Sequence, residues 1–238
     1  MRILVANPHL VRLNAFGACE QDRLKNAQTF LHLGHEVRAF TFSTPAQPIE
    51  AVTQVYADRG LPVTVVPITH ARLEPARLTD LAYLDGAAWQ YAQSKYLSAF
   101  EDTLAEFQPD LIWCHGSYHW APARLARSHG LRTVIRSVNY EPEQLRHEHD
   151  ASLANTIRYF GKVQSERRAL QSANVMAAIT PDELGIYERV DPATCVQLLP
   201  LATLPELLRE PTVRDLRPLH SCFMGATYNV PHNRRALD

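Results

Sequence analysis

Residues 109–141 read PDLIWCHGSYHWAPARLARSHGLRTVIRSVNYE, and this stretch decides the fold of the chain. It holds two short apolar runs, 111–114 and 132–136, separated by a segment of helical length, 120–129, that Gly130 ends. Short apolar runs joined through a helix are typical of a parallel βαβ unit. The stretch therefore predicts two neighbouring parallel strands with a helix between them.

Polar side chains follow both predicted strands at the point where each strand ends. Six residues share this position: His115, Ser117 and Tyr118 after the first strand, and Ser137, Asn139 and Glu141 after the second. In open sheets built from such units, ligands bind beyond the carboxyl ends of the strands. We therefore expect the chemistry of this protein at that edge of the sheet.

The rest of the chain repeats the same alternation of strands and helices. Further strands are predicted at 3–6, 36–42, 62–68, 174–179 and 194–199. Helices are predicted at 20–33, before Gly60, at 77–107 with Gly86 as a bend or break, at 152–173, and from the Thr180-Pro181-Asp182 turn onward. Strands that alternate with helices form a parallel sheet covered on both faces. The predicted fold class is α/β, a Rossmann-like doubly wound parallel sheet of six or seven strands.

The composition of the sequence changes after residue 199. Four prolines stand close together in residues 200–218, which is typical of a linker. An apolar run at 219–224 and a helix start near Pro231 then resemble the opening of a second α/β domain. We therefore expect a first domain at 1–199, a linker at 200–218, and a truncated second domain at 219–238.

Composition and charge exclude several classes of protein. The chain has 238 residues, of which 46% are hydrophobic and 21% charged, and its formal net charge is −1. These values are ordinary for a globular protein and give no sign of a nucleic-acid partner. No apolar run approaches the roughly 20 residues of a spanning helix, and Met1 leads straight into a strand without room for a signal peptide. We expect a cytoplasmic protein whose four dispersed cysteines are free thiols.

Several other chemistries fit the sequence less well. The first strand is followed by Asn-Pro-His at 7–9, without the glycine fingerprint of a dinucleotide site, and the chain has no P-loop. Ser117 stands between a strand and a helix, but His115 and His119 occupy positions where a hydrolase elbow requires glycine. The same two histidines could bind zinc only if one helix held both, and His115 ends a strand. With 11 histidines in the chain, chance clusters are expected, and no metal site is predicted.

Basic residues recur along the predicted helix at 152–173. They are Arg158, Lys162, Arg167 and Arg168. Such residues could form a face toward anionic lipid headgroups at the inner surface of a membrane. A solvated helix surface is the commoner explanation, so peripheral membrane contact stays open as one of two readings.

Five segments, in order along nearly the whole chain, resemble the family 4-like (group 1) glycosyltransferases of the GT-B fold. Residues 34–37 (GHEV) match a motif that commonly follows the first helix of these enzymes, and 109–115 (PDLIWCH) is similar to their "PDLIHAH" strand. Residues 136–141 (RSVNYE) resemble "RSHNIE", with Val138 in place of the histidine. Residues 166–182, with Glu166 at the start, resemble the "E-R-x-L-x-x-A-D…S-P-x-D" stretch, and 222–233 resemble "FxG…PPN" at the start of the second domain.

The resemblance implies the N-terminal, acceptor-side half of a retaining glycosyltransferase. Such an enzyme transfers a hexose from a nucleotide-diphosphate sugar, its co-substrate, to a hydroxyl of a saccharide or lipid-linked acceptor, and needs no other cofactor. The missing half would hold most of the nucleotide contacts, so the fragment alone is expected to be inactive. A sugar-nucleotide epimerase of the same two-domain architecture and a non-catalytic carbohydrate-binding module remain as alternatives.

The resemblance also implies roles for particular residues. His115 matches the family histidine that contacts the donor hexose, with a hydrogen-bonded structural histidine as the alternative. Gly17 would offer a backbone amide to the donor phosphate in a loop that usually carries paired glycines. The remaining substrate-binding residues are expected to be Ser117, Tyr118, Asn139, Glu141 and Thr180. Of these, Tyr118 could instead pack on the next helix, and Asn139 could instead cap the helix near Pro142.

The apolar run at 219–224 has a further consequence. Its natural partners would lie in the missing domain, which leaves an apolar strand with unpaired backbone groups. We expect this tail either to pair with a second copy of the chain, giving a strand-exchanged homodimer, or to be poorly ordered.

Overall fold

The computed structural model describes residues 1–10, 18–68, 80–149 and 152–200. Gly17, nearly all of the predicted linker and the whole of 219–238 lie outside the described residues. The expectations about the linker, the second domain and the exchanged strand therefore stay predictions.

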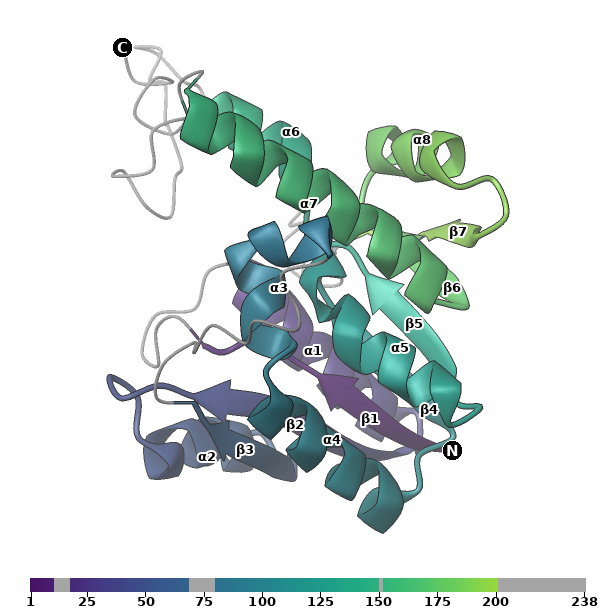
Figure 1. The fold of residues 1–238 in the computed structure, drawn as a ribbon. Coiled ribbons are helices and arrows are strands. Elements are labelled where there is room, and N and C mark those ends of the chain that lie inside the picture. The colour runs from purple at the N-terminus through teal and green to yellow at the C-terminus, as the bar shows by residue number, and fades with distance from the viewer. Residues whose placement is uncertain (11–17, 69–79, 150–151, 201–238) are drawn as a thin grey trace, which may run out of the picture.

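A seven-stranded parallel sheet forms the centre of the molecule (Figure 1). Its strands are β1 (Arg2–Ala6), β2 (Glu36–Ser43), β3 (Val63–Pro67), β4 (Leu111–His115), β5 (Arg132–Arg136), β6 (Val175–Ala178) and β7 (Cys195–Leu198). They follow the order β3-β2-β1-β4-β5-β6-β7, and each neighbouring pair is parallel. The predicted α/β fold class is confirmed, and the two strands of the 109–141 stretch lie side by side.

The strand order reverses direction between β1 and β4. From β1 the chain builds outward through β2 and β3, and then returns to add β4 on the other side of β1. Loops that leave two such strands in opposite directions open a crevice at the carboxyl edge of the sheet. The end of β4, which carries His115, lies at this point.

Helices cover both faces of the sheet, as Figure 1 shows. They are α1 (Ala18–His32), α2 (Ile49–Ala57), α3 (Gly86–Tyr91), α4 (Ser94–Phe107), α5 (Trp120–Ser128), α6 (Glu141–Glu148), α7 (Leu153–Ser172) and α8 (Pro181–Val190). Alternate residues of β1 point to opposite faces. Ile3 and Val5 join a core with α1 and α2, whereas Leu4 and Ala6 join the larger core under α4, α5 and α7. The continuous apolar character of β1 follows from burial on both faces.

Within its described part, the helical pattern predicted at 77–107 breaks at Gly86, as the sequence allowed, and breaks a second time before Ser94, which was not predicted. Residues 80–107 form a short 3-10 helix, η2 (Leu81–Leu84), followed by α3 and α4. The carboxylate of Asp80 accepts a hydrogen bond from the amide of Ala82, and Asp85 does the same for Ala87. These two side chains each begin a new helical segment, and Gln93 is extended before α4. Apolar spacing continued across these breaks because every segment packs on the same core.

Candidate functional site

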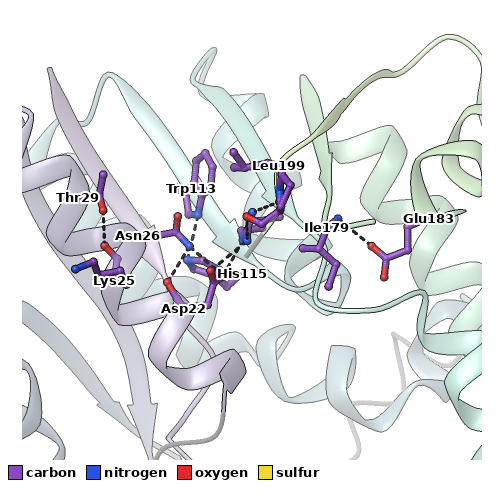
Figure 2. Close-up of polar contacts among 11 residues, drawn as sticks. Asp22, Lys25, Asn26, Thr29, Trp113, His115, Ile179, Glu183 and Leu199 are labelled. Atoms are coloured by element: carbon purple, nitrogen blue, oxygen red, sulfur yellow. Dashed lines mark hydrogen bonds and ion pairs between the residues drawn. The ribbon is translucent and has the colours of Figure 1, made fainter. Parts of the chain in front are cut away.

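His115 ends β4 and is completely buried. The indole Nε1–H of Trp113 donates a hydrogen bond to its Nε2 over 3.1 Å, as Figure 2 shows. Burial lowers the pKa of His115 well below its usual value, and the nearby charges of Arg23 and Arg136 lower it further. Because an indole can only donate, Nε2 must accept and the proton of the neutral ring lies on Nδ1. That Nδ1 has no hydrogen-bond partner among the described residues.

Ser117 and Tyr118 follow in η3 (Ser117–His119), and both are buried. The hydroxyl of Ser117 donates to Oε1 of Glu166 over 2.9 Å. The Tyr118 ring stacks on Tyr91, with centroids 5.3 Å apart, and its hydroxyl accepts from Nη2 of Arg23 over 3.4 Å. These contacts favour a packing role for Tyr118 over stacking on a sugar, with Tyr91 of the preceding helix α3 as its partner and not the next helix.

Asn139 and Glu141 stand at the start of α6, beyond the end of β5. The N-cap of α6 is Tyr140, and no side chain caps this helix, so the suggested capping role of Asn139 is wrong. Its amide nitrogen donates instead to Oε1 of Gln144 over 2.9 Å. In this arrangement the side chain of Asn139 is oriented by α6 and remains only partly buried.

Glu141 takes part in an ion-pair cluster that joins three segments. Its Oε2 lies 2.8 Å from Nζ of Lys162 on α7, and the same ammonium lies 3.6 Å from Oδ1 of Asp85. Burial alone would lower the pKa of Lys162, but the Asp85 and Glu141 carboxylates outweigh it and raise the pKa above its usual value. The lysine is therefore charged and held in place by α6 and the start of α3.

Thr180 is the N-cap of α8 and is exposed. Its hydroxyl oxygen accepts a hydrogen bond from the amide of Glu183 over 3.2 Å. A threonine side chain that accepts from the third residue of a helix in this way is a common N-cap.

Two hollows open near the strand ends. The first, which we call the α3–α6–α7 hollow, has a volume of about 300 Å³ and is lined by Asp85, Glu141 and Lys162 among others. The second, the α6–α8 hollow, has a volume of about 360 Å³ and is lined by Asn139, Thr180 and Glu183 among others. Small-molecule sites usually have volumes upward of roughly 300 Å³, so both hollows are of the size of a small site.

The structure thus divides the predicted site residues among three places. His115, Ser117 and Tyr118 are buried below the strand ends. Glu141 lines the α3–α6–α7 hollow, and Asn139 and Thr180 line the α6–α8 hollow. Gly17 lies outside the described residues.

Sequence reasoning assigned no role to Glu166, which connects these places. It is buried on α7, where its Oε1 accepts from the Ser117 hydroxyl and from the amide of Glu141, and its Oε2 lies 3.1 Å from the Tyr187 hydroxyl. A signal was present, because Glu166 stands among the apolar residues of α7 and begins a segment that resembles the family.

Arg136 and Asp22 form a second feature that sequence reasoning missed. Nε and Nη2 of the buried Arg136 lie 3.0 and 3.2 Å from the two carboxylate oxygens of Asp22 on α1. The same guanidinium donates to the carbonyls of Leu199 (2.7 Å) and Pro200 (3.0 Å), where the described chain leaves the sheet. Figure 2 shows Asp22 and Leu199 close to one another, with the hydrogen bonds drawn as dashed lines. Partners 114 residues apart cannot be matched from one sequence.

Two of the four basic residues considered for lipid binding form ion pairs within the domain. Lys162 is committed to Glu141 and Asp85, and Arg168 pairs with Asp80 over 2.9 Å. None of the described helices is both long and apolar enough to cross a membrane. His119 is buried against Tyr91, and burial lowers its pKa to about 3. Within the part of the chain that the structure describes, no three His, Cys, Asp or Glu side chains are arranged to hold a metal ion.

Comparisons with solved structures support the fold. Sucrose-phosphate synthase from Thermosynechococcus elongatus is similar with a TM-score of 0.56 and 17% identity, over 84% of this chain and 47% of that one. UGT2 of Phytolacca americana is similar with a TM-score of 0.53 and 12% identity, over 88% of this chain and 55% of that one. The chain therefore spans about half the length of these two structures.

Sequence comparisons give the family. No curated protein sequence matches the chain. The model of the glycosyl transferase 4-like domain, however, matches residues 23–201, which is most of the chain and nearly all of the described sheet. This match confirms the resemblance seen in the motifs, and the chain belongs to the glycosyl transferase 4-like family.

Proposed function

We propose that this chain is the N-terminal, acceptor-side half of a retaining hexosyltransferase that uses a nucleotide-diphosphate sugar. The observation that carries the proposal is the state of His115. It is neutral, it stands at the end of β4 beside the reversal of strand order, and its Nδ1–H has no partner among the described residues. A buried donor without a partner is costly, so a ligand hydroxyl is a natural acceptor for it.

In this function His115 acts as a hydrogen-bond donor and not as a base. Breaking the bond between the anomeric carbon and the diphosphate creates oxocarbenium character in the sugar and negative charge on the leaving group. The acceptor oxygen then bonds to that carbon, and its proton leaves to a diphosphate oxygen. Orientation of the hexose by the neutral imidazole is the contribution required of this half. Arg23 on α1, which already lies near His115, supplies positive charge on the same side.

The hollows suit an acceptor. Carboxylates and amides bind sugar hydroxyls well, and the α3–α6–α7 hollow presents Asp85, Glu141 and Gln144 beside the fixed ammonium of Lys162. A third hollow of about 360 Å³, between α6 and α7, is lined by Tyr159 and Phe160 and is more apolar. The first hollow favours a saccharide, and the third would accommodate the apolar part of a lipid-linked acceptor.

An experiment on the chain itself tests the role of His115. The imidazole Nδ1–H is followed by nitrogen-edited NMR while nucleotide diphosphates and their hexose conjugates are added at millimolar concentration. We expect the hexose conjugates, and not the bare diphosphates, to shift the signal of His115, whereas the buried imidazole of His119 stays unchanged as an internal control. If no conjugate moves the His115 signal in the folded chain, the proposed donor contact is refuted.

The two alternatives give different outcomes. An epimerase would convert a sugar nucleotide into its epimer with no acceptor present, whereas a transferase needs an acceptor hydroxyl. A non-catalytic carbohydrate-binding module would bind a free saccharide as well as the nucleotide conjugate. Product analysis with the complete protein, with and without acceptor, separates all three.

We propose a cytoplasmic location with peripheral contact to the inner face of the membrane. Leu153, Ile157 and Phe160 on α7 are exposed and lie one helical turn or so apart, on one face. Sedimentation of the chain with vesicles, with and without anionic lipid, tests this contact. Loss of binding in Phe160→Ser would support it, and absence of binding to either vesicle would refute it.

A further inference from the structure

Glu166 is a buried carboxyl group at the meeting point of four segments. It is 1% exposed. Its Oε1 accepts from the Ser117 hydroxyl after β4 (2.9 Å) and from the Glu141 amide after β5 (3.2 Å). Its Oε2 lies 3.1 Å from the Tyr187 hydroxyl on α8. One side chain of α7 therefore holds the segments that follow β4 and β5, together with α8.

The hydrogen bonds beyond Tyr187 restrict where the protons of this group of side chains can lie. The Tyr187 hydroxyl is also 3.0 Å from Oγ of Ser137, which in turn is hydrogen-bonded to the carboxylate of Glu183. A hydroxyl has one proton to donate. If Ser137 donates to Glu183, then Tyr187 donates to Ser137, and the contact between Tyr187 and Glu166 needs a proton from Glu166.

The charges around Glu166 favour its neutral form. Glu141 and Asp85 carry two negative charges and Lys162 one positive charge, so a further carboxylate would leave this cluster with a net charge of −2. On α8, Glu183 is separated from Glu166 by the hydroxyls of Ser137 and Tyr187. Tyr140 and Tyr187, which lie nearby, are neutral and contribute no positive charge. Burial raises the pKa of Glu166 to about 8, and the Glu141 carboxylate raises it in the same direction. The hydrogen bonds donated by the Ser117 hydroxyl and by the Glu141 amide favour the charged form, and burial outweighs them.

We propose that Glu166 is a neutral carboxylic acid that positions the ends of β4 and β5, and that its proton exchanges with the α6–α8 hollow through Tyr187, Ser137 and Glu183. The exchange is balanced. Glu166 gives its proton to the Tyr187 oxygen, Tyr187 gives its own to Ser137, and Ser137 gives its own to the Glu183 carboxylate. One negative charge thereby moves from Glu183, which lines the α6–α8 hollow, to Glu166. Glu166 is thus a positioning residue for Ser117 and Glu141; only its influence on sugar binding rests on the proposed function.

Infrared spectroscopy of the chain tests the protonation directly. The carbonyl band of a protonated carboxylic acid is recorded between about pH 6 and about pH 10, well above the range where ordinary carboxyl groups are protonated. We expect a band in the wild type that disappears with a midpoint near pH 8 and is missing in Glu166→Gln. Tyr187→Phe removes the acceptor of the proton, so its band should remain and shift. No band in the wild type, or a band that Glu166→Gln leaves unchanged, overturns the proposal.

The pH dependence of unfolding gives a second readout on the same variants. In the unfolded chain Glu166 has a pKa near 4.5, whereas the folded value is about 8. The folded state therefore keeps a proton that the unfolded state loses, so this contribution to stability is full below pH 4.5 and is lost as the pH rises to 8. The unfolding temperature of Glu166→Gln should exceed that of the wild type by an amount that grows over this range and then levels off. Glu188→Gln, an exposed change on α8, should show a constant difference, and the same constant difference in Glu166→Gln would contradict the proposal.

Donor binding measured over the same pH range separates this proposal from the proposed function. If hexose conjugates bind, their effect on the His115 signal should weaken above pH 8 in the wild type and stay level in Glu166→Gln. If no conjugate binds at any pH, the proposed function fails, and the infrared and unfolding results still decide the state of Glu166.

Discussion

Replacing Arg136 by methionine should remove one of the most stabilising polar contacts of the domain. Methionine is close to arginine in length and fills the same apolar space without a charge. The change removes the guanidinium from the carboxylate of Asp22, which is 3% exposed and keeps the hydrogen bond from Asn26. It also leaves the carbonyls of Leu199 and Pro200 without their donor.

The expected magnitude follows from this burial. Removing one member of a buried ion pair costs about 3–5 kcal/mol, because the other charge remains away from water. Surface pairs contribute about 0.2–1 kcal/mol. The pair of Arg38 and Glu106 has a similar N–O distance of 2.8 Å, but its side chains are 26% and 70% exposed, so Arg38→Met is a matched control.

Urea unfolding followed by tryptophan fluorescence measures both variants. For a urea dependence of roughly 2–3 kcal/mol per M, Arg136→Met should lower the midpoint by roughly 1–2 M, and Arg38→Met by a few tenths. Asp22→Asn keeps one acceptor for the guanidinium and should cost less than Arg136→Met. In the double variant of Asp22→Asn with Arg136→Met, the loss should be smaller than the sum of the single losses, because the buried carboxylate is gone.

Two outcomes would refute this reasoning. A loss for Arg136→Met within the range of the surface control would mean that the ion pair and the bonds to Leu199 and Pro200 contribute little. Additive losses in the double variant would mean that the two side chains do not stabilise one another.

Four further predictions concern activity, packing and assembly. The chain alone should show no measurable sugar transfer and should bind nucleotide diphosphates with a dissociation constant no tighter than about 1 μM by calorimetry. His115→Ala should reduce sugar transfer by the complete protein while the circular dichroism of the chain stays unchanged. Gly161→Ala should destabilise the chain by about 1–3 kcal/mol in urea unfolding, because the new methyl group would lie 2.7 Å from a backbone carbon of η2. Gly185→Ala is the control and should not destabilise the chain, because the nearest atom to its methyl group is the end of a flexible side chain at 3.4 Å. If residues 219–224 exchange strands, this chain should sediment as a dimer and a chain ending near Leu208 as a monomer; two monomers would contradict it.

Much of the fold could be predicted from local sequence. The apolar runs of β1, β4 and β5 are continuous because each strand is buried on both faces. Their spacing around segments of helical length fixed the parallel arrangement, since a parallel pair needs such a crossover. The break of the 77–107 pattern at Gly86 was allowed for, whereas the second break before Ser94 was missed, because the apolar spacing continues across it.

The places of two candidate residues were predicted, and their roles stay predictions. His115 ends β4 and Glu141 stands beyond β5, as the predicted strands placed them. The alternative contacts could not be predicted. Whether Tyr118 faces a sugar or Tyr91, and whether Asn139 caps a helix or bonds Gln144, depends on side-chain directions that neighbouring elements set.

The sequence by itself determined the fold class, the family and the edge of the sheet where the chemistry is expected. These properties depend on short-range periodicity and on the order of motifs along the chain. Both can be read from the sequence without knowing which distant residues are in contact. The tertiary structure alone decided that Glu166 joins Ser117, Glu141 and Tyr187, and that Arg136 meets Asp22 from 114 residues away. Burial is the physical reason: a charged side chain looks the same in a sequence whether it faces water or the core. Its partners and its pKa exist only once distant segments have packed around it.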